Sequence, residues 1–591
     1  MCGIIGLVKR NGDAVADVYG GLKRLEYRGY DSAGMAALAD GVISVVKRKG
    51  GVDTLEDGVK ALKGCVAMGH TRWATHGEPS DVNAHPHTSG KIAIVHNGII
   101  ENFAALAVQC EEEGERLLSQ TDSEVIAKLI DKYYSSSGNL LTSVARAVKR
   151  LEGSFALLVM CADYEGLIAV RYKSSQVVGF AREGTFVASD IPALPTSVSS
   201  VFLPQDGTIT AVTRFEIKAY DFDLNSVKCV SQGISLGQWS ADKGNFAHFM
   251  LKEINESGQT IADTVKAFMH CGGRARLKKM LEDADRIIIT GCGTAYNAGL
   301  AAKPFFERMG KFCSVEIASE VRYFPPEVTH KSVVIAVSQS GETADTVEAV
   351  SLLKGRGANV IAVTNCGYSA ITRAAHMVVP VCAHAEICVA ATKSYIGQIA
   401  ALYLLSNVGG DVQSAGERLI KTAELVKGVA EDKNRAEKIA KECAGYRAVF
   451  FLGRGSDYSS AVEASLKFKE VSYVFSDAYP TGELKHGTLA LIDESTMSVF
   501  IICEPTVAEK CVNAVEQVLS RKGRAVVLTC LDEVENELKE KAEIWRIPQG
   551  MRDLTPILSA VALQTLAYYT AVALGRNPDK PRHLAKSVTV E

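Results

Sequence analysis

The chain has 591 residues, of which 47% are hydrophobic and 23% are charged, and its formal net charge is −3. At about 150 residues per domain this length predicts three or four domains, and the near-neutral charge balance argues against a nucleic-acid partner. Fifteen cysteines without a CxxC pair or a signal peptide predict reduced thiols in a cytoplasmic protein, and not a disulfide framework.

The first ten residues, MCGIIGLVKR, place a cysteine directly behind the initiator methionine. If Met1 is removed, Cys2 carries both a thiol and a free α-amine. Such an amine has a pKa of about 7.7 to 8.0 and can accept the thiol proton, so that nucleophile and base belong to one residue. The alternative is that Cys2 is a small buried hydrophobe, the usual environment of a free cysteine.

Short strand patterns dominate the chain up to about Val230, and helical patterns interrupt them. This combination predicts a layered α+β domain in which sheets pack on each other. In the helix expected over residues 121–134, Thr121 or Asp122 is placed to cap the first turn and Glu124 to support it. Strands are expected over residues 66–75, 92–100, 154–162, 167–172 and 185–190.

Residues 235–249 (SLGQWSADKGNFAHF) break this periodicity, so we expect a first domain over residues 1–239 and a linker over residues 240–246. From about Asp285 the pattern changes to strands rich in Val and Ile, each followed by a short Gly or Ser loop and a helix, which is typical of parallel βαβ units. The pattern then repeats, with GRGS at residues 453–456 standing where GCGT stands at residues 291–294. The sequence therefore predicts two doubly wound α/β domains with parallel sheets, over residues 247–425 and 426–575, and a tail over residues 576–591.

The two copies differ in one loop. The first copy has SQSGET after its second strand, from Ser338 to Thr343, whereas the corresponding FIICEPTVAEK of the second copy lacks the Ser and Gly residues. Small hydroxylated residues that open a helix offer backbone N–H groups and hydroxyls to an anion, so we expect one phosphate site in the pair, although an ordinary capped helix start would have the same composition. No GK[ST] follows, so the loop does not indicate a nucleoside triphosphate.

One stretch is long and apolar enough to span a membrane. Residues 556–575 (PILSAVALQTLAYYTAVALG) contain no charged residue. Because the stretch carries polar side chains, follows a proline and stands alone in the sequence, we expect a buried helix of a large core and no membrane segment.

Seven motifs together identify a family. The chain resembles the N-terminal-nucleophile amidotransferases in which a glutaminase domain of αββα type precedes two sugar isomerase (SIS) domains, and the resemblance covers essentially all of its length. It implies an enzyme that converts fructose 6-phosphate and L-glutamine to glucosamine 6-phosphate and L-glutamate, as a homodimer and without a cofactor or metal. The motifs are LEYRGYDSAG (25–34), HTRWATHG (70–77), NAHPH (83–87), VHNGIIEN (95–102), TDSEVI (121–126), GELKHG (482–487) and PRHLAKSVTVE (581–591).

In the N-terminal motifs the resemblance implies a glutaminase mechanism. Cys2 would attack the side-chain amide of glutamine, and Asn97 and Gly98 would donate hydrogen bonds to the oxyanion. Arg72 would hold the α-carboxylate of glutamine and Asp122 its α-ammonium group, although isolated charges are more often solvated surface residues.

Four further positions follow from the same motifs. Trp73 would gate a shielded path for ammonia, although a tryptophan at an interface more often simply packs. The spacing of the histidines in these motifs fits no metal site, so we interpret them as structural or close to substrate. The positions implied to bind glutamine are Thr75, His76 and His85.

In the second half the resemblance assigns the sugar chemistry. Lys586 would form a Schiff base with the C2 ketone, His486 would open the sugar ring, and Glu470 would move a proton between C1 and C2. Glu463 and Lys467 share one helix face with Glu470, which an ordinary ion-pair ladder would also explain. The positions implied to bind sugar phosphate are Thr294, Ser338, Gln339, Ser340, Thr343, Val389, Ala391 and Ala585.

Two alanines depart from the family pattern. Ala295 and Ala391 stand where serine is expected, and each lost hydroxyl removes a hydrogen bond worth about 0.5 to 1.5 kcal/mol. The departures leave open a related enzyme that acts on another ketose phosphate. A sugar-phosphate sensor without glutaminase activity is a further alternative, which the retained Cys2, Asn97 and Lys586 argue against.

Overall fold

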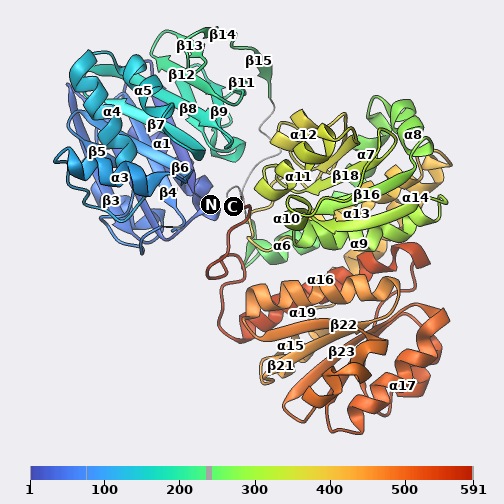
Figure 1. The fold of residues 1–591 in the computed structure, drawn as a ribbon. Helices are drawn as coiled ribbons and strands as arrows, with labels where there is room; N and C mark the ends of the chain where they lie inside the picture. The colour runs from blue at the N-terminus through green and yellow to red at the C-terminus, as the bar shows by residue number, and fades with distance from the viewer. Residues whose placement is uncertain (1, 75, 235–242, 589–591) are drawn as a thin grey trace. The chain divides into compact units, whose positions relative to one another are not determined.

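The computed structural model describes residues 2–74, 76–234 and 243–588. Thr75 and residues 240–242 of the expected linker therefore lie outside the described residues. By its internal contacts the chain divides into two compact units, Met1–Ala241 with Ala585–Glu591, and Asp242–Leu584 (Figure 1).

The first unit contains two antiparallel sheets. The strands of the first sheet are, in spatial order, β15 (Ser231–Gly233), β11 (Ser200–Phe202), β9 (Val177–Phe180), β10 (Gly184–Ala188), β1 (Gly3–Lys9), β4 (Val66–Arg72), β2 (Ser32–Ala39) and β3 (Val42–Lys49). Those of the second are β14 (Ser226–Val227), β13 (Ile217–Tyr220), β12 (Thr208–Thr213), β8 (Tyr164–Tyr172), β7 (Gly153–Cys161), β6 (Ile92–Ile100) and β5 (His87–Ser89).

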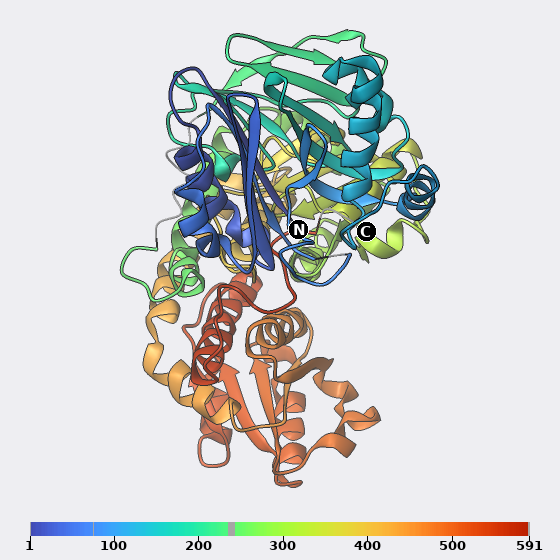
Figure 2. The ribbon, with the colours of Figure 1, turned by 90° about the vertical axis from the view of Figure 1, so that its left-hand side faces the viewer.

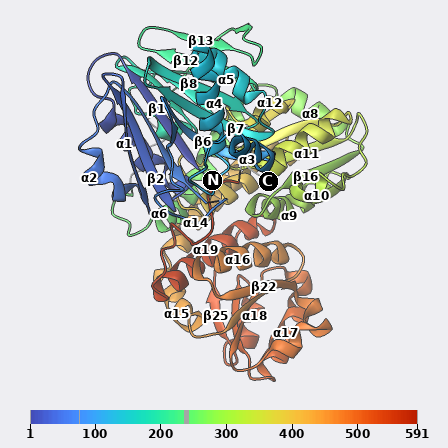
Figure 3. The same cartoon turned by 60° about the vertical axis from the view of Figure 1, so that its left-hand side comes forward.

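Helices cover the outer faces of these sheets and complete four layers, αββα (Figure 3). Because successive strand side chains point to opposite faces, Ile5 packs toward α1 (Val15–Leu25) while its neighbour Ile4 packs between the sheets. On the far side Ile94 packs against helices α4 (Glu124–Ser137) and α5 (Leu140–Val148). The predicted α+β layered domain is confirmed.

The start of α4 differs from the prediction. Ser123 occupies the N-cap position without a side-chain capping bond, so neither Thr121 nor Asp122 caps the helix. Instead Thr121 Oγ1 bonds to His87 Nε2 at 3.0 Å, and the Asp122 carboxylate accepts the Ile100 N–H at 2.8 Å. Both side chains thus bond to residues of the second sheet, and these bonds replace the expected capping bonds to α4.

The second unit contains two parallel sheets with the same topology, as the repeat predicts. The strands of the first are β17 (Phe312–Ile317), β16 (Arg286–Gly291), β18 (Val333–Ser338), β19 (Asn359–Thr364) and β20 (Met377–Pro380). Those of the second are β22 (Phe475–Pro480), β21 (Ala448–Gly453), β23 (Thr496–Ile502), β24 (Arg524–Thr529) and β25 (Glu543–Arg546).

Helices flank both sheets, and those between the sheets share one hydrophobic core with both of them. In this shared layer α9 (Thr294–Glu307) packs against α13 (Lys393–Ser406) and α16 (Ser456–Ser472), and α16 packs against α19 (Thr555–Ala573). The remaining helices include α6 (Phe249–Asn255), α7 (Ser257–His270), α8 (Arg274–Glu282), α11 (Ala344–Gly355), α12 (Ala370–Ala374), α14 (Val412–Glu431), α15 (Lys433–Cys443), α17 (Ala508–Leu519) and α18 (Asp532–Leu538).

The long apolar helix α19 belongs to this core. Among the described residues, Arg552–Ala573 is the one helical stretch long and apolar enough to cross a membrane, and 89% of its apolar window is buried inside the protein. Figure 2 shows α19, in red, lying beside the second parallel sheet. Its apolar surface is therefore used for packing, as expected from the sequence.

Candidate active sites

The Cys2 thiol lies where the first sheet presents the ends of two strands. Strand β1 begins at Gly3, which pairs with Thr71 near the end of β4, so the thiol meets the residues that follow β4. Its Sγ lies 3.4 Å from the Trp73 backbone nitrogen and 3.5 Å from the Trp73 carbonyl oxygen. The thiol is thus held at a fixed place beside the HTRWATHG motif.

The two residues assigned to the oxyanion come from the second sheet. Asn97 and Gly98 lie on β6, and the Asn97 side-chain amide donates to the Cys2 carbonyl at 2.9 Å. Gly98 has φ of +129°, and a Cβ there would lie 1.9 Å from the Ser154 carbonyl oxygen. Only glycine fits at this position, and it keeps the backbone accessible next to Asn97.

Burial has the largest influence on the pKa of the Cys2 thiol. It raises the pKa of the Cys2 thiol, while the Trp73 backbone amide and the Arg72 guanidinium act in the opposite direction. A thiol with a raised pKa remains largely protonated at neutral pH and needs a base before it can attack. Arg72 and Asp122 both lie close enough to influence the thiol electrostatically, so the structure brings these three predicted residues together.

Arg72 is buried, with 3% of its surface exposed, and is held from one side only. Its Nη2 donates to the carbonyl oxygens of His76 and Gly77, the latter at 3.0 Å. Its Nη1 has no hydrogen-bond partner among the described residues. An anchored guanidinium with one unpaired nitrogen fits a role in binding a carboxylate.

The predicted histidines form a buried group beside this site. The His85 ring lies 4.1 Å from that of His70 and 4.6 Å from that of His87, and neither His85 nitrogen has a hydrogen-bond partner among the described residues. Burial lowers the pKa of His70 to about 3 and that of His85 well below its usual value. These rings are neutral at pH 7, and no group of three or more His, Cys, Asp or Glu side chains within the described ranges is arranged to hold a metal ion.

In the second unit the SQSGET loop joins β18 to α11. Ser338 Oγ accepts the Gly341 N–H at 2.9 Å and lies 3.2 Å from Thr343 Oγ1. Gly341 has φ of +66°, and a Cβ there would lie 2.0 Å from Ser369 Oγ, so the turn requires glycine. The loop thus has a defined shape, with hydroxyls at the start of a twelve-residue helix.

In the second copy a side chain of the protein binds the loop that is equivalent to SQSGET. Strand pairing aligns position 333 with 497, which places Cys503 and Glu504 where Gln339 and Ser340 stand. The N–H groups of Cys503 and Glu504 donate to Asp457 Oδ2 at 2.8 and 3.0 Å. In the aligned GCGT and GRGS segments, Asp457 corresponds to Ala295. In the second copy a carboxylate of the chain itself therefore accepts these two amides, whereas Ala295 offers no carboxylate at the equivalent position of the first copy.

The predicted helix face on α16 is a buried ionic cluster and not a surface ladder. Lys467 Nζ lies 2.6 Å from Glu470 and 3.7 Å from Glu463, and the Lys467 and Glu463 side chains are each 1% exposed. Although burial opposes it, these two carboxylates raise the pKa of Lys467. Burial raises the pKa of Glu463 to about 7 against the attraction of Lys467.

This cluster is bound to the other copy through α9. Thr294 Oγ1 and Asn297 Nδ2 donate to the Glu463 carboxylate at 3.2 and 2.8 Å. The structure thereby joins Thr294 to the helix of Glu470. Asn297 was missed in the sequence, although its spacing of three residues from Thr294 places both on one helix face.

Among the described residues, no hydrogen bond or ion pair brings the other predicted residues together. His486 is exposed at the end of a short 3₁₀ helix, Thr481–His486, and no hydrogen bond or ion pair in the described part of the chain joins it to Glu470. Ala585 and Lys586 group with the first unit, whereas Glu470 belongs to the second. The roles of these residues stay predictions.

Comparison with known proteins matches three segments of the chain to known domain families. Residues 70–196 match the glutamine amidotransferase domain family, and residues 280–408 and 444–574 each match the SIS domain family. The chain is 40% identical to the glutamine–fructose-6-phosphate aminotransferase (isomerizing) of Caldanaerobacter subterraneus and 42% identical to that of Aquifex aeolicus, and both alignments cover 100% of each chain. The chain belongs to this family.

A solved structure supports the family assignment for the second unit. The C-terminal domain of glucosamine-fructose-6-phosphate aminotransferase from Francisella tularensis matches with a TM-score of 0.53 and 31% sequence identity, covering 58% of this chain and 100% of that one. The predicted fold class of two SIS domains after an amidotransferase domain is confirmed.

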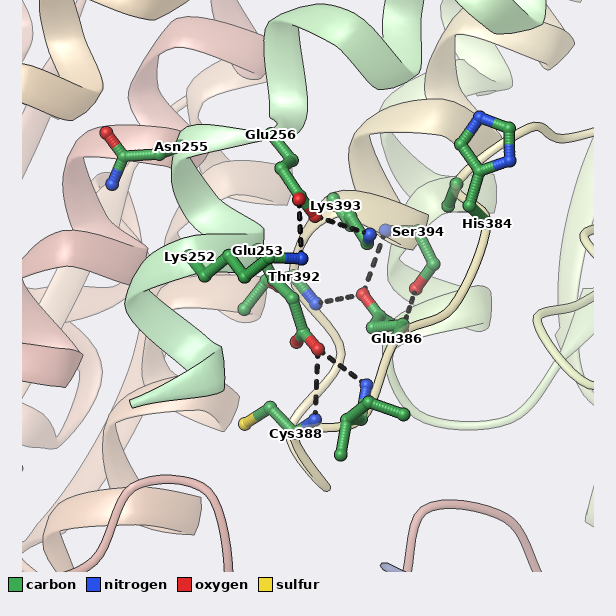
Figure 4. Close-up of polar contacts among 12 residues, drawn as sticks. Lys252, Glu253, Asn255, Glu256, His384, Glu386, Cys388, Thr392, Lys393 and Ser394 are labelled. Carbon is green, nitrogen blue, oxygen red and sulfur yellow. Dashed lines mark hydrogen bonds and ion pairs between the residues drawn. The ribbon is translucent and has the colours of Figure 1, made fainter. Parts of the chain in front are cut away.

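Two buried carboxylates that the sequence did not reveal shape the loop containing Val389 and Ala391. Glu253 on α6 accepts the N–H groups of Ile387 and Cys388 at 2.5 and 3.2 Å (Figure 4). Glu386 accepts those of Thr392 and Ser394 at 2.9 and 3.0 Å, and the Ser394 hydroxyl at 2.7 Å. The loop has no regular structure, so these acceptors fix its course.

We predict that Asp457→Asn stabilises the protein at high pH only. Burial raises the pKa of Asp457 to about 7. In the unfolded chain it is about 3.9, so stability due to this proton is full below pH 4 and is lost as the pH rises through 7. Asparagine can accept both amides on one oxygen without ionising. Its advantage over wild type should therefore grow from near zero at pH 3, through about 1 kcal/mol at pH 4.5, to at most about 4 kcal/mol above pH 7.5.

Thermal unfolding of both proteins across this pH range measures the difference. Asp411→Asn, which alters an exposed helix-capping carboxylate of the same unit, controls for the loss of a charge. A difference between Asp457→Asn and wild type that does not change with pH would contradict the buried, proton-linked role of Asp457.

Proposed function

We propose that the chain transfers the amide nitrogen of L-glutamine to fructose 6-phosphate, giving L-glutamate and glucosamine 6-phosphate. The main support is the position of Cys2, whose thiol lies against the Trp73 backbone and whose carbonyl oxygen accepts a hydrogen bond from the Asn97 side chain, in a chain that matches this family over its whole length. Glutamine and water give glutamate and ammonia, and ammonia and fructose 6-phosphate give the amino sugar and water. The sum consumes neither oxidant nor reductant, so the reaction requires no redox cofactor.

In the glutaminase half Cys2 is the nucleophile. Because burial raises the pKa of its thiol, a base must take the proton, and the α-amine freed by removal of Met1 is on the same residue. Attack on the glutamine amide carbon gives a tetrahedral oxyanion, which the Asn97 side chain and the Gly98 backbone stabilise. Loss of ammonia leaves a thioester, and water then releases glutamate.

Two charges orient the glutamine backbone in this proposal. Arg72, with one nitrogen unpaired among the described residues, binds the α-carboxylate, and Asp122 binds the α-ammonium group. The family motifs also assign His76, His85 and Thr75 to glutamine binding. Trp73, whose backbone contacts the thiol, guards a shielded path for ammonia, because ammonia that reached water would be protonated.

In the isomerase half the SQSGET loop binds the phosphate through Ser338, Gln339, Ser340 and Thr343. Thr294, Val389, Ala391 and Ala585 contact the sugar. His486 opens the ring, Lys586 forms an imine with the C2 ketone, and ammonia displaces the lysine from C2. Glu470 then moves a proton from C1 to C2, which leaves an aldehyde at C1 and an amine at C2. Ala295 and Ala391 favour testing other ketose phosphates beside fructose 6-phosphate.

We further propose a cytoplasmic homodimer. The fifteen cysteines are all free, which suits a reducing compartment. The edge strands β17 and β22 begin with exposed aromatic residues at equivalent positions, Phe312 and Phe475, which are 67% and 61% exposed. Close to β17 in sequence, Tyr323 and Phe324 are 60% and 79% exposed. Large apolar side chains exposed on and near a sheet edge favour a protein partner.

The first test is product formation. With glutamine and fructose 6-phosphate we expect wild type to form glucosamine 6-phosphate, and Cys2→Ala to lose glutamine hydrolysis while still binding the sugar phosphate, because the two chemistries lie in separate domains. Mass spectrometry of the products and calorimetric titration of the sugar phosphate measure both. Appreciable glutaminase activity in Cys2→Ala would contradict the role of the thiol, and an amino sugar formed only from another ketose phosphate would reassign the substrate.

The second test concerns Lys586. Borohydride reduction in the presence of fructose 6-phosphate should attach the sugar to Lys586, as peptide mass mapping would reveal. Lys586→Arg keeps the charge but cannot form the imine, so amino-sugar synthesis should be lost while glutamine hydrolysis continues. Near-normal synthesis by Lys586→Arg would show that the lysine has another role.

The third test concerns the dimer. Light scattering after size-exclusion chromatography should give twice the chain mass for wild type. A Tyr323→Asp, Phe324→Asp double variant should give the mass of one chain at micromolar concentration, because two charges would be buried without partners in the interface. The variant Phe215→Asp changes an aromatic residue of the first unit that is 92% exposed, and it should remain dimeric. A monomeric wild type would refute the proposal.

A further inference from the structure

The chain that leads into the tail is attached to the second unit at two separated places. We call residues 576–582 the anchor segment. Its first attachment is Asp579, whose carboxylate accepts the N–H groups of Phe249 and Met250 on α6, both at 2.8 Å. The Asp579 carbonyl oxygen accepts the Val389 N–H at 3.1 Å. One residue thus connects α6, the loop that contains Val389 and the anchor segment.

Further hydrogen bonds join each of these three segments to the other two. Glu253, on the same helix α6, accepts the N–H groups of Ile387 and Cys388 (Figure 4). The Cys388 thiol in turn donates to the Pro578 carbonyl oxygen at 3.3 Å. Because each segment is bonded to both others, a shift of the anchor segment must displace the loop that contains Val389.

The second attachment is Tyr473, which ends α16. Its hydroxyl accepts the Arg582 N–H at 2.7 Å, and its ring lies 4.4 Å from the Arg582 guanidinium and 5.3 Å from that of Arg576. Tyr473 follows Glu470 by three residues on the helix that carries the ionic cluster. The anchor segment is therefore fixed against both the loop that contains Val389 and the end of the helix bearing Glu470.

We propose that Asp579 and Tyr473 are positioning residues for Lys586, an inference that rests on the proposed function. Lys586 follows Arg582 by four residues, which span at most about 14 Å even when extended. Fixing Arg582 thus limits how far the lysine can move from the anchor segment, and restricting the position of a reacting group raises its effective concentration at the substrate. The two anchors set where the imine forms without contacting the sugar themselves.

Four variants test this proposal. Asp579→Ala removes both bonds to α6 and Asp579→Asn keeps one acceptor, while Tyr473→Ala removes ring and hydroxyl and Tyr473→Phe removes the hydroxyl only. Borohydride trapping of fructose 6-phosphate on Lys586, and kcat and KM for synthesis, are measured on the full-length enzyme. We expect both alanine variants to lose at least tenfold in trapping rate and kcat, and KM to rise by a smaller factor, because the Val389 loop shifts with the anchor segment whereas the SQSGET loop is not one of the three bonded segments. The Asn and Phe variants should lose less.

Matched controls separate positioning from general damage. Asp411→Ala removes an aspartate that caps α14 of the same unit by accepting the Ser414 N–H at 2.9 Å, and it should trap the sugar at the wild-type rate. Glutamine hydrolysis without sugar and the thermal midpoint report folding. If an alanine variant does not fold, the Asn and Phe variants decide, since each retains most of the side chain.

The outcomes distinguish this inference from the proposed function. A wild type that forms neither imine nor amino sugar refutes the function. An active wild type with Asp579 and Tyr473 variants that trap the sugar at the wild-type rate refutes the positioning role. A loss in KM alone, or an equal loss in Asp411→Ala, also refutes it, because either result would point to substrate binding or helix stability.

Discussion

Backbone N–H groups that leave regular secondary structure need an acceptor, and at the sites of this chain buried or partly buried carboxylates provide it. Glu253 and Glu386 hold the loop of Val389, and Asp579 holds the start of α6. Asp122 accepts the amide at the end of β6. A carboxylate oxygen can accept several bonds at once, and charged acceptors bond more strongly than neutral ones. Irregular segments therefore become as well defined as the sheets around them.

The same requirement distinguishes the loops of the two copies. In the second copy Asp457 accepts the loop amides of Cys503 and Glu504, and nothing remains there for an external anion. In the first copy Ala295 stands at the equivalent position and has no acceptor to offer. A difference at one helix position thus determines whether a side-chain carboxylate of the chain itself accepts the loop amides. The second copy contributes α16 to the layer of helices between the two parallel sheets.

The sequence predicted the elements whose signal is periodic or repeated. Strand β6 has the predicted bounds, and both parallel sheets follow from their runs of Val and Ile. Motif residues such as Asn97 and Arg72 received their roles from their neighbours in the chain, and those roles stay predictions. The cap of α4 was wrong since propensity counts local partners only, whereas Asp122 bonds to a strand distant in sequence. Local rules fail where tertiary contacts offer a better partner.

Lone acids such as Asp457, Asp579 and Glu253 could not be predicted, because a single buried acid has the same sequence appearance as a surface one. The cluster on α16 was partly predictable. The spacing of its residues indicated that they are in contact, but their burial, which sets the pKa of Glu463, could not be predicted from the sequence. Two carboxylates surround one lysine, so one negative charge is in excess. Glu470 lies 2.6 Å from Lys467 and is 21% exposed, whereas Glu463 is farther away and almost wholly buried. The excess charge is least favourable on Glu463, whose pKa burial raises to about 7, so the first proton is taken up there. Glu470, beside Lys467, lies at the more exposed end of the cluster, which is the position that its proposed role in proton transfer requires.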